Sequence, residues 1–431
     1  MDVKKYKVLV LAEAANPEWT SVPLIGWSYA EALGRLCDIH LVTQIRNKAA
    51  IERQGWVEGK EFTALDTELI AKPINLISRI VRGGDKLAWT VATAFQSFIY
   101  PYFEYKCWRL FSQRLKDGEF DVVHRITPVS PTAPSYLAKK LKSIGIPFVV
   151  GPMNGGVEWP DQFSDRRRQE KEWLTKFRKM YKLLPGYKSM RKTSSAILAG
   201  SRAVQQQLPK YANDKVIYMP ENGIDTKRFT VTGRESLGKP LLRAVFIGRL
   251  VPYKGVDMAI NAIQHVASLG RIRYDVFGAG PEMEKLQSQI NSLGLEKSIK
   301  LHGNVAHSEL SAHLKDADIL IFPSIREFGG GVVLEAMACG IVPVVVDYAG
   351  PSELVDESCG YLVELGNQRQ IECRLTSLIE RIIENPSELI EKSKNGMSKI
   401  KDKYTWHTKA ENTLRIYSWV LGESEKPQLP Y

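Results

Sequence analysis

Cysteine is scarce in this chain, and the cysteines that are present form no recognisable set. The 431 residues include five cysteines, an odd number, and no two of them have the CxxC spacing. Disulfide scaffolds and zinc sites both need cysteines in paired or closely spaced sets. The sequence therefore predicts a protein of a reducing compartment, with neither a disulfide framework nor a zinc site.

Long apolar segments are also lacking, and we expect residues 1–5 not to form part of a leader peptide. Residues 1–5 lead directly into an apolar run at residues 7–11, a pattern that does not fit a signal peptide. Residues 87–103 carry no charge but contain Gln96 and Pro101, so they make a poor membrane span. Their apolar residues recur at helical spacing, which favours a core or interfacial helix. We expect a cytoplasmic protein whose only membrane contact would be peripheral, on the inner face of the membrane.

Acidic residues are in short supply only in the first half. Residues 1–240 hold 38 Lys and Arg against 24 Asp and Glu, whereas residues 241–431 hold 21 against 24. In residues 166–192 eleven basic residues accompany two glutamates and an apolar stripe at helical spacing. This pattern predicts a basic amphipathic helix that either docks on an anionic membrane or packs on its own domain. Nucleic acid is not an expected partner, because no nucleic-acid module accompanies the charge.

The most informative stretch of the second half is residues 318–340. An apolar run at residues 318–324 predicts a buried strand, and a run of three glycines then precedes a short helix. The backbone amides and positive end of such a helix suit an anion, whereas the carboxylates on either side of the loop suit hydroxyl groups. The stretch therefore predicts a site for a ligand with both phosphate and sugar hydroxyls. The residues expected to form it are Glu327, Gly329, Gly330, Gly331, Val332 and Glu335.

A second motif places one arginine and one lysine between a strand and a helix. The strand expected at residues 244–247 ends at Gly248, and Arg249 and Lys254 follow it. A guanidinium fork and an ammonium point charge suit a diphosphate whose negative charge grows as a bond to it breaks. A further turn contains Gly278 and Gly280, although a lone Gly-x-Gly is weak evidence for a nucleotide site.

These motifs resemble the signature of glycosyltransferase family 4. The resemblance rests on the Glu-x7-Glu pair, on the EAMACG sequence after the glycines, and on the GRLxxxKG pattern at residues 248–255. It implies an α/β protein of the GT-B fold, in which two Rossmann-like domains face a cleft and the last helix crosses back to the first domain. Two Rossmann-like domains also suit the length and the alternation of strands and helices. We expect a first domain at residues 1–222 joined by residues 405–431, and a second at residues 223–404.

The resemblance also implies a role for each candidate residue of the donor site. Arg249 and Lys254 would bind the donor diphosphate, Glu327 the hydroxyls of the donor sugar, and Glu335 those of the ribose. His124, just past a strand of the first domain, would complete the sugar pocket, and its alternative is a buried structural histidine. No metal or other cofactor is implied. The loop after the strand at residues 147–150 either faces the acceptor or is an ordinary turn, and its candidates are Asn154, Gly155 and Glu158.

The implied function is that of a retaining glycosyltransferase of the hexosyltransferase type. It would move a sugar from a nucleotide-diphosphate sugar to a glycan, a lipid-linked or a small-molecule acceptor, in polysaccharide or glycolipid biosynthesis. Two alternatives stay open. One is an epimerase that changes a nucleotide sugar without an acceptor, and the other is a catalytically silent GT-B protein that binds a nucleotide sugar.

Overall fold

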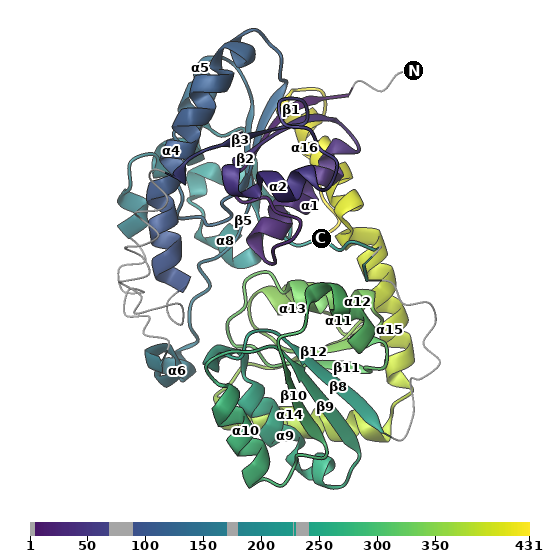
Figure 1. Ribbon diagram of the computed structural model, residues 1–431. Helices are drawn as coiled ribbons and strands as arrows, with labels where there is room; N and C mark the ends of the chain where they lie inside the picture. The colour runs from purple at the N-terminus through teal and green to yellow at the C-terminus, as the bar shows by residue number, and fades with distance from the viewer. Residues whose placement is uncertain (1–4, 69–88, 170–179, 227, 230–240) are drawn as a thin grey trace. The chain divides into compact units, whose positions relative to one another are not determined.

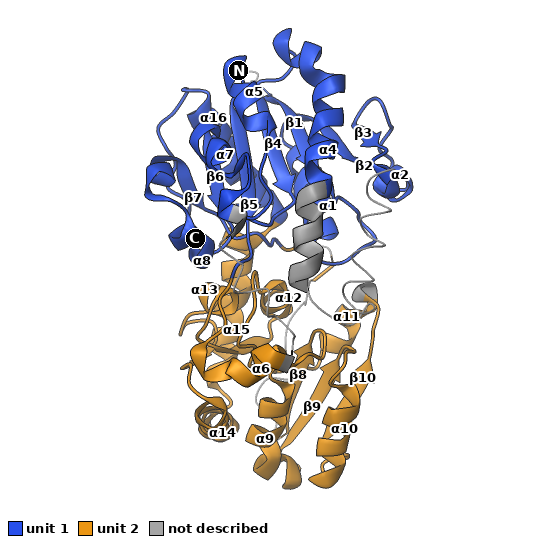
Figure 2. Ribbon diagram, turned by 90° about the vertical axis from the view of Figure 1, so that its left-hand side faces the viewer, with its two compact units in different colours: residues 1–156, 171–223, 406–431 blue, residues 157–170, 224–405 orange. Residues whose placement is uncertain are grey.

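The chain forms two compact α/β units, which Figure 2 distinguishes by colour. The computed structural model describes residues 5–68, 89–169, 180–226, 228–229 and 241–431. Unit 1 comprises Met1–Gly156, Lys171–Gly223 and Trp406–Tyr431, and unit 2 comprises Val157–Glu170 and Ile224–Thr405. The segment that begins at Val157 thus belongs to unit 2, whereas the sequence analysis kept it in the first domain.

Within the described residues, unit 1 is built on a seven-stranded parallel sheet of order β3-β2-β1-β4-β5-β6-β7 (Figure 1). Its strands are β1 (Lys7–Ala12), β2 (Asp38–Gln44), β3 (Phe62–Leu65), β4 (Val122–Thr127), β5 (Phe148–Met153), β6 (Ala196–Ala199) and β7 (Val216–Tyr218). Its helices are α1 (Val22–Gly34), α2 (Lys48–Glu52), α4 (Trp89–Lys116), α5 (Leu137–Ser143), α7 (Tyr187–Thr193), α8 (Arg202–Gln207) and α16 (Trp406–Val420).

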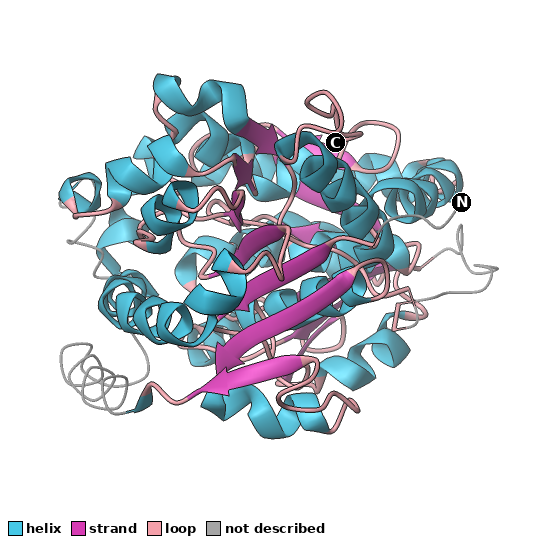
Figure 3. Cartoon of the chain, turned by 90° about the horizontal axis from the view of Figure 1, so that it is seen from above, coloured by secondary structure: helices cyan, strands magenta, loops and turns pink. Residues whose placement is uncertain are grey.

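The two faces of this sheet have separate cores, and helices cover both (Figure 3). Leu9 and Leu11 of β1 pack with one cluster, and Val8 and Val10 pack with the other. This division follows from the alternation of side chains along a strand. Because both faces are covered, β6 and most of β1 are continuous apolar runs.

The uncharged stretch of the first half lies in a core helix, as expected. From Trp89 onward it forms the first part of α4, and Tyr100, Phe103 and Cys107 on that helix are buried against the sheet. Tyr102, on the same helix, is half-buried. None of the helices in the described ranges is long and apolar enough to cross a membrane.

The single basic helix predicted for residues 166–192 is not present. Residues 170–179 lie outside the described part, and α6 (Ser164–Gln169) before them is separate from α7 after them. Gly186, with φ of +90°, follows Pro185 and starts α7 afresh, since neither residue sustains a helix interior. Two of the basic side chains, those of Arg166 and Arg191, are buried and do not contribute to a charged surface.

Unit 2 contains a parallel sheet with the strand order β10-β9-β8-β11-β12-β13, in which six described strands take part. Its strands are β8 (Leu242–Ile247), β9 (Ile272–Phe277), β10 (Ile299–Gly303), β11 (Ile319–Phe322), β12 (Val342–Val346) and β13 (Tyr361–Val363). Its helices are α6, α9 (Val256–Ser268), α10 (Met283–Ser292), α11 (His307–Leu314), α12 (Gly331–Ala338), α13 (Gly350–Leu354), α14 (Gln368–Glu384) and α15 (Glu388–Lys399). A π-helical turn, Ile400–Tyr404, follows α15.

The last helix returns to unit 1, as the family resemblance implied. Helix α16 packs on α1, where the Tyr29 hydroxyl lies 2.6 Å from the Thr413 hydroxyl. Ile416 and Tyr417 are fully buried in the same core as β1. Helix α16 therefore contributes to the same hydrophobic core as β1 and α1.

Candidate active site

The arginine–lysine motif and the glycine loop lie at the same edge of the sheet of unit 2. Strands β8 and β11 are parallel neighbours, with Ile319 opposite Ala244 and Leu320 opposite Val245. Their carboxyl ends lie side by side, and in open α/β sheets ligands bind at this edge. The loop after β8 carries Lys254, and the loop after β11 carries Glu327.

Lys254 is held in a short turn whose backbone is bonded to the loop after β11. The turn is a 3₁₀ turn, Pro252–Lys254, and its Tyr253 carbonyl accepts hydrogen bonds from the Ile325 amide at 2.9 Å and the Ser324 hydroxyl at 3.3 Å. Gly255 ends the turn with φ of +70°, and a Cβ there would lie 2.5 Å from the Pro323 carbonyl oxygen. Only glycine combines that φ with so close an approach.

Lys254 and Glu327 form an ion pair with each other. The Lys254 ammonium contacts the Glu327 carboxylate, and the two side chains are 12% and 20% exposed. The ammonium also lies 4.6 Å from the centre of the Phe322 ring, which gives it a cation–π contact. The two residues that the sequence assigned to diphosphate and sugar thus meet at one partly shielded point.

The glycine loop joins Glu327 to the N-terminus of α12. Gly330 has φ of +59°, and the helix begins at Gly331. On its other side the loop is bonded to α13, because the Gly350 amide donates to the Glu327 carbonyl at 3.3 Å. Val332 and Glu335 are half-buried in the first turns of α12. Backbone amides and the positive end of a helix thus lie beside Glu327, as an anion site requires.

The glycines after β8 and β9 allow two loops to pack by their backbones. A Cβ at Gly278 would lie 1.9 Å from the Gly248 carbonyl oxygen, and one at Gly280 would lie 2.2 Å from the Leu250 carbonyl oxygen. The Leu250 amide donates to the Ala279 carbonyl at 3.0 Å. The loop that carries the exposed Arg249 therefore rests directly on the loop after β9. Gly278 and Gly280 first of all set the shape of this edge.

The Asp-x-Asp sequence before β11 has a structural role. The Asp318 carboxylate accepts a hydrogen bond from the Arg243 amide at 2.8 Å, and Asp316 pairs with the Arg243 guanidinium at 3.1 Å. Both carboxylates thus fasten β11 to β8. In the described part of the chain no group of three or more His, Cys, Asp or Glu side chains gathers as a metal site would need.

The expectation that His124 faces the donor sugar does not match its environment. His124 is fully buried in β4, with Nε2 2.8 Å from the Gly151 carbonyl oxygen and Nδ1 2.7 Å from the Tyr417 hydroxyl. Since a carbonyl only accepts, Nε2 carries the proton, and Nδ1 accepts from Tyr417. Burial lowers the pKa of His124 to about 4, so the ring is neutral near pH 7. It has the geometry of the alternative, a buried structural histidine that links β4 to α16.

The three candidates for the acceptor side lie in different parts of the molecule. Asn154 is buried in unit 1, where its side-chain oxygen accepts from the Gly155 amide at 2.7 Å. Its amide nitrogen has no hydrogen-bond partner among the residues that the structure describes. Gly155 is half-buried beside it. Glu158 is exposed and belongs to unit 2, whereas the other two belong to unit 1.

Sequence reasoning missed three side chains that border the Lys254–Glu327 pair. Arg326 is buried directly before Glu327, and its guanidinium lies 5.2 Å from the Trp159 ring. Trp159 in turn meets Tyr253, which precedes Lys254, with ring centres 6.0 Å apart. Each of the three is the immediate neighbour of a candidate residue, since Arg326 precedes Glu327, Tyr253 precedes Lys254 and Trp159 follows Glu158. This adjacency was the signal that could have found them.

Comparison with known proteins accounts for the motifs of unit 2. Residues 234–396 match the model of the family described as glycosyl transferases group 1. The chain carries a glycosyl transferases group 1 region. A putative colanic acid biosynthesis glycosyltransferase, WcaL of Salmonella typhimurium, is 33% identical over 161 residues, 36% of this chain and 39% of that protein. The 2-deoxystreptamine glucosyltransferase of Streptomyces kanamyceticus is 26% identical over 198 residues, 46% of this chain and 49% of that protein. These matches span less than half the length of either relative.

Solved structures extend the likeness to the whole fold. A glycosyltransferase from Rickettsia africae has a TM-score of 0.63 at 15% identity, over 98% of this chain and 100% of that one. Anabaena HepE in complex with UDP has a TM-score of 0.63 at 17% identity, over 96% of this chain and 99% of that one. The chain therefore has the GT-B fold, as the family resemblance implied.

Proposed function

We propose that this chain is a retaining glycosyltransferase that moves a sugar from a nucleotide-diphosphate sugar to a glycan or lipid-linked acceptor. The observation that carries the proposal is the contact of Lys254 with Glu327, beside the glycine loop and the N-terminus of α12. Support comes from the group 1 match, from relatives named for polysaccharide biosynthesis, and from HepE, which was solved with UDP and glucose.

The Lys254–Glu327 pair is suited to be exchanged for a nucleotide sugar. A diphosphate replaces Glu327 as the partner of the Lys254 ammonium, and the sugar hydroxyls replace Lys254 as the partners of the Glu327 carboxylate. Each charge then gains a ligand group of the right chemistry without becoming unpaired, which a partly shielded site requires. The pair holds both side chains in place before the donor arrives.

Departure of the diphosphate is the step that these residues assist most. Negative charge grows on the leaving diphosphate as the bond to the sugar breaks, while the sugar develops oxocarbenium character. Lys254, Arg249 and the amides at the start of α12 all present positive charge or dipoles to that group. They supply the charge compensation for which other enzymes use a metal ion, so we propose that no metal takes part.

The exposed part of the basic segment remains a candidate for peripheral contact with an anionic membrane. Leu183 is 81% exposed, and the exposed Lys182 and Lys188 lie on either side of it. An apolar side chain between basic residues suits a membrane surface. A lipid-linked acceptor would be presented there, in keeping with relatives named as phosphatidylinositol N-acetylglucosaminyltransferase subunits.

A turnover assay with UDP-, GDP- and ADP-sugars tests the proposal. We expect slow release of nucleoside diphosphate from one donor class, lost in Lys254→Ala and Glu327→Ala. Lys297→Ala and Glu296→Ala serve as controls, because both side chains are exposed just before β10, at the opposite edge of the sheet. Anionic vesicles added to the same assay test the membrane contact, which predicts faster release with them.

The same assay separates the alternatives. An epimerase would change the nucleotide sugar and release no nucleotide. A silent binding protein would bind a donor but show no turnover under any of these conditions. Either outcome would contradict the proposed transfer reaction.

A further inference from the structure

A segment from the first half of the chain lies across the two loops that carry Lys254 and Glu327. We call it the strap, residues 157–169. It contains a 3₁₀ turn, Asp161–Phe163, and α6, and it clusters with unit 2 although unit 1 both precedes and follows it in sequence. Figure 2 shows α6 in the colour of unit 2.

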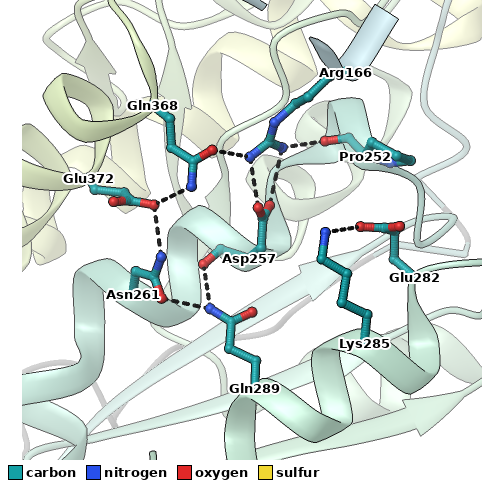
Figure 4. Close-up of polar contacts among 9 residues, drawn as sticks. All are labelled: Arg166, Pro252, Asp257, Asn261, Glu282, Lys285, Gln289, Gln368 and Glu372. Carbon is teal, nitrogen blue, oxygen red and sulfur yellow. Dashed lines mark hydrogen bonds and ion pairs between the residues drawn. The ribbon is translucent and has the colours of Figure 1, made fainter. Parts of the chain in front are cut away.

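Arg166 of α6 holds the lysine turn from both ends (Figure 4). Its guanidinium donates to the Pro252 carbonyl and forms a bidentate pair with Asp257, with distances of 3.1 and 2.7 Å to the two carboxylate oxygens. Pro252 begins the turn that ends with Lys254, and Asp257 lies in the first turn of α9. The Pro252 carbonyl before Lys254 and the Asp257 carboxylate after it are therefore bonded to one rigid, planar group.

Arg166 is buried and Asp257 half-buried, and further polar groups support the pair. The Arg166 side chain is 9% exposed and that of Asp257 16%. The guanidinium also donates to the Gln368 side chain at 3.0 Å, and Gln289 donates to the Asp257 carbonyl at 3.1 Å. Asn261 and Glu372 connect these two glutamines through hydrogen bonds, as Figure 4 shows. A network that is this well connected restricts where Asp257 can lie.

The strap also touches the loop that carries Glu327. The Arg326 guanidinium lies over Trp159 and donates from Nε to the Val157 carbonyl at 3.4 Å. The Tyr348 hydroxyl donates to the Glu158 carbonyl at 2.8 Å. Trp159 packs edge-on against Tyr253, so one aromatic side chain spans both loops.

We infer that Arg166 is a positioning residue for the donor-diphosphate site: by holding Pro252 and Asp257 it sets the place of Lys254. This inference rests on the proposed function, since it concerns how that same site is held. Arg166 itself would not touch the ligand, and it acts through Lys254 alone. Arg166, which the sequence analysis placed in a basic amphipathic helix, thus supports the nucleotide site.

A double-mutant cycle in the intact chain tests this inference. The dissociation constants of UDP, GDP and ADP are measured for the wild type, Arg166→Ala, Lys254→Ala and the double variant. One of the three nucleotides should bind to the wild type, and we expect Arg166→Ala to raise its dissociation constant by about tenfold or more. The reason is that a small misplacement of a binding group has large effects. In the Lys254→Ala background the same substitution should have almost no further effect, since residues that act as a unit are not additive.

Two further variants separate positioning from general stability. Arg167→Ala removes an exposed arginine from the same helix and should bind nucleotide as the wild type does. Arg166→Lys keeps the charge but cannot fork between Pro252 and Asp257, so it should recover thermal stability more fully than nucleotide affinity. An equal loss for Arg166→Ala in both backgrounds, or no loss at all, would overturn the inference.

Amide hydrogen exchange distinguishes failure of the inference from failure of the proposed function. Without nucleotide, residues 249–257 should exchange about tenfold faster in Arg166→Ala than in the wild type, while Arg167→Ala leaves them unchanged. If the wild type binds no nucleoside diphosphate, the proposed function fails. Unchanged exchange in Arg166→Ala would then overturn the positioning role as well, and faster exchange would support it.

Discussion

At the scale of single residues, Lys254 and Glu327 have different partners in a nucleotide sugar, so their substitution should affect ligand binding differently. We predict that Lys254→Ala weakens the binding of both the free nucleotide and the nucleotide sugar by about tenfold or more, since the variant loses the diphosphate contact. Glu327→Ala should weaken only the nucleotide sugar. Each of the three single variants, Lys254→Ala, Glu327→Ala and Arg249→Ala, should lower kcat/KM by about a hundredfold or more. Calorimetric titration and initial rates measure these quantities.

The contrast between the two variants is the informative result. If Glu327→Ala weakened the free nucleotide as strongly as Lys254→Ala, the assignment of Glu327 to the sugar would be wrong. Lys297→Ala should behave as the wild type in both titrations, because Lys297 is exposed just before β10, at the other edge of the sheet.

His124 gives a prediction about pH. Its pKa is lowered to about 4 by burial, from an ordinary value of 6.5, so the unfolded chain binds a proton between these values and the folded chain does not. Stability must therefore fall as pH falls through this window. From pH 7 to pH 5 the contribution of His124 is about 2 kcal/mol. Denaturant unfolding of the wild type and His124→Asn should show a flatter pH dependence for the variant.

His407 is the matched control for that experiment. Its side chain is 61% exposed, and it lies on the same helix, α16, that His124 contacts. The His407→Asn variant should keep the pH slope of the wild type. Equal slopes for wild type and His124→Asn would contradict the buried, neutral state of His124.

At the scale of elements, the close packing of the loops after β8 and β9 is the feature most open to test. Gly278 has φ of +138° and no room for a Cβ, whereas Gly270 has φ of +68° and open space around it. We predict that Gly278→Ala lowers the free energy of unfolding by about 3 kcal/mol and weakens nucleotide binding as Arg249 moves. Gly270→Ala should cost about 1 kcal/mol and leave binding unchanged. Similar effects of the two variants would contradict the account.

Much of this edge of the sheet could be predicted from sequence, because its signals are local. The apolar run before Glu327, the three glycines and the helix after them lie within one short stretch, and each has its own preference. The roles of Arg166 and Trp159 could not be predicted, since the groups they contact lie far along the chain. The run of basic residues around Arg166 favoured a surface, and only the contact with Asp257 shows otherwise. The sequence left the two roles of His124 open for the same reason, because its partner Tyr417 lies on the last helix.

At the scale of the whole molecule, each unit is completed by chain from elsewhere in the sequence. Unit 1 receives α16 from the end of the chain, and unit 2 receives the strap from the first half. The family resemblance anticipated the return of α16. No local pattern marked the strap, because the chain passes into unit 2 and back within 14 residues, Val157–Glu170.

Thermal unfolding of the intact chain with UDP-, GDP- and ADP-sugars tests the central claim most directly. A donor at 100 times its dissociation constant should stabilise the fold by about 2.7 kcal/mol, and one class of donor should do so. The account predicts that this stabilisation disappears in Lys254→Ala and persists in Lys297→Ala. No stabilisation of the wild type by any donor, or equal stabilisation of wild type and Lys254→Ala, would contradict it.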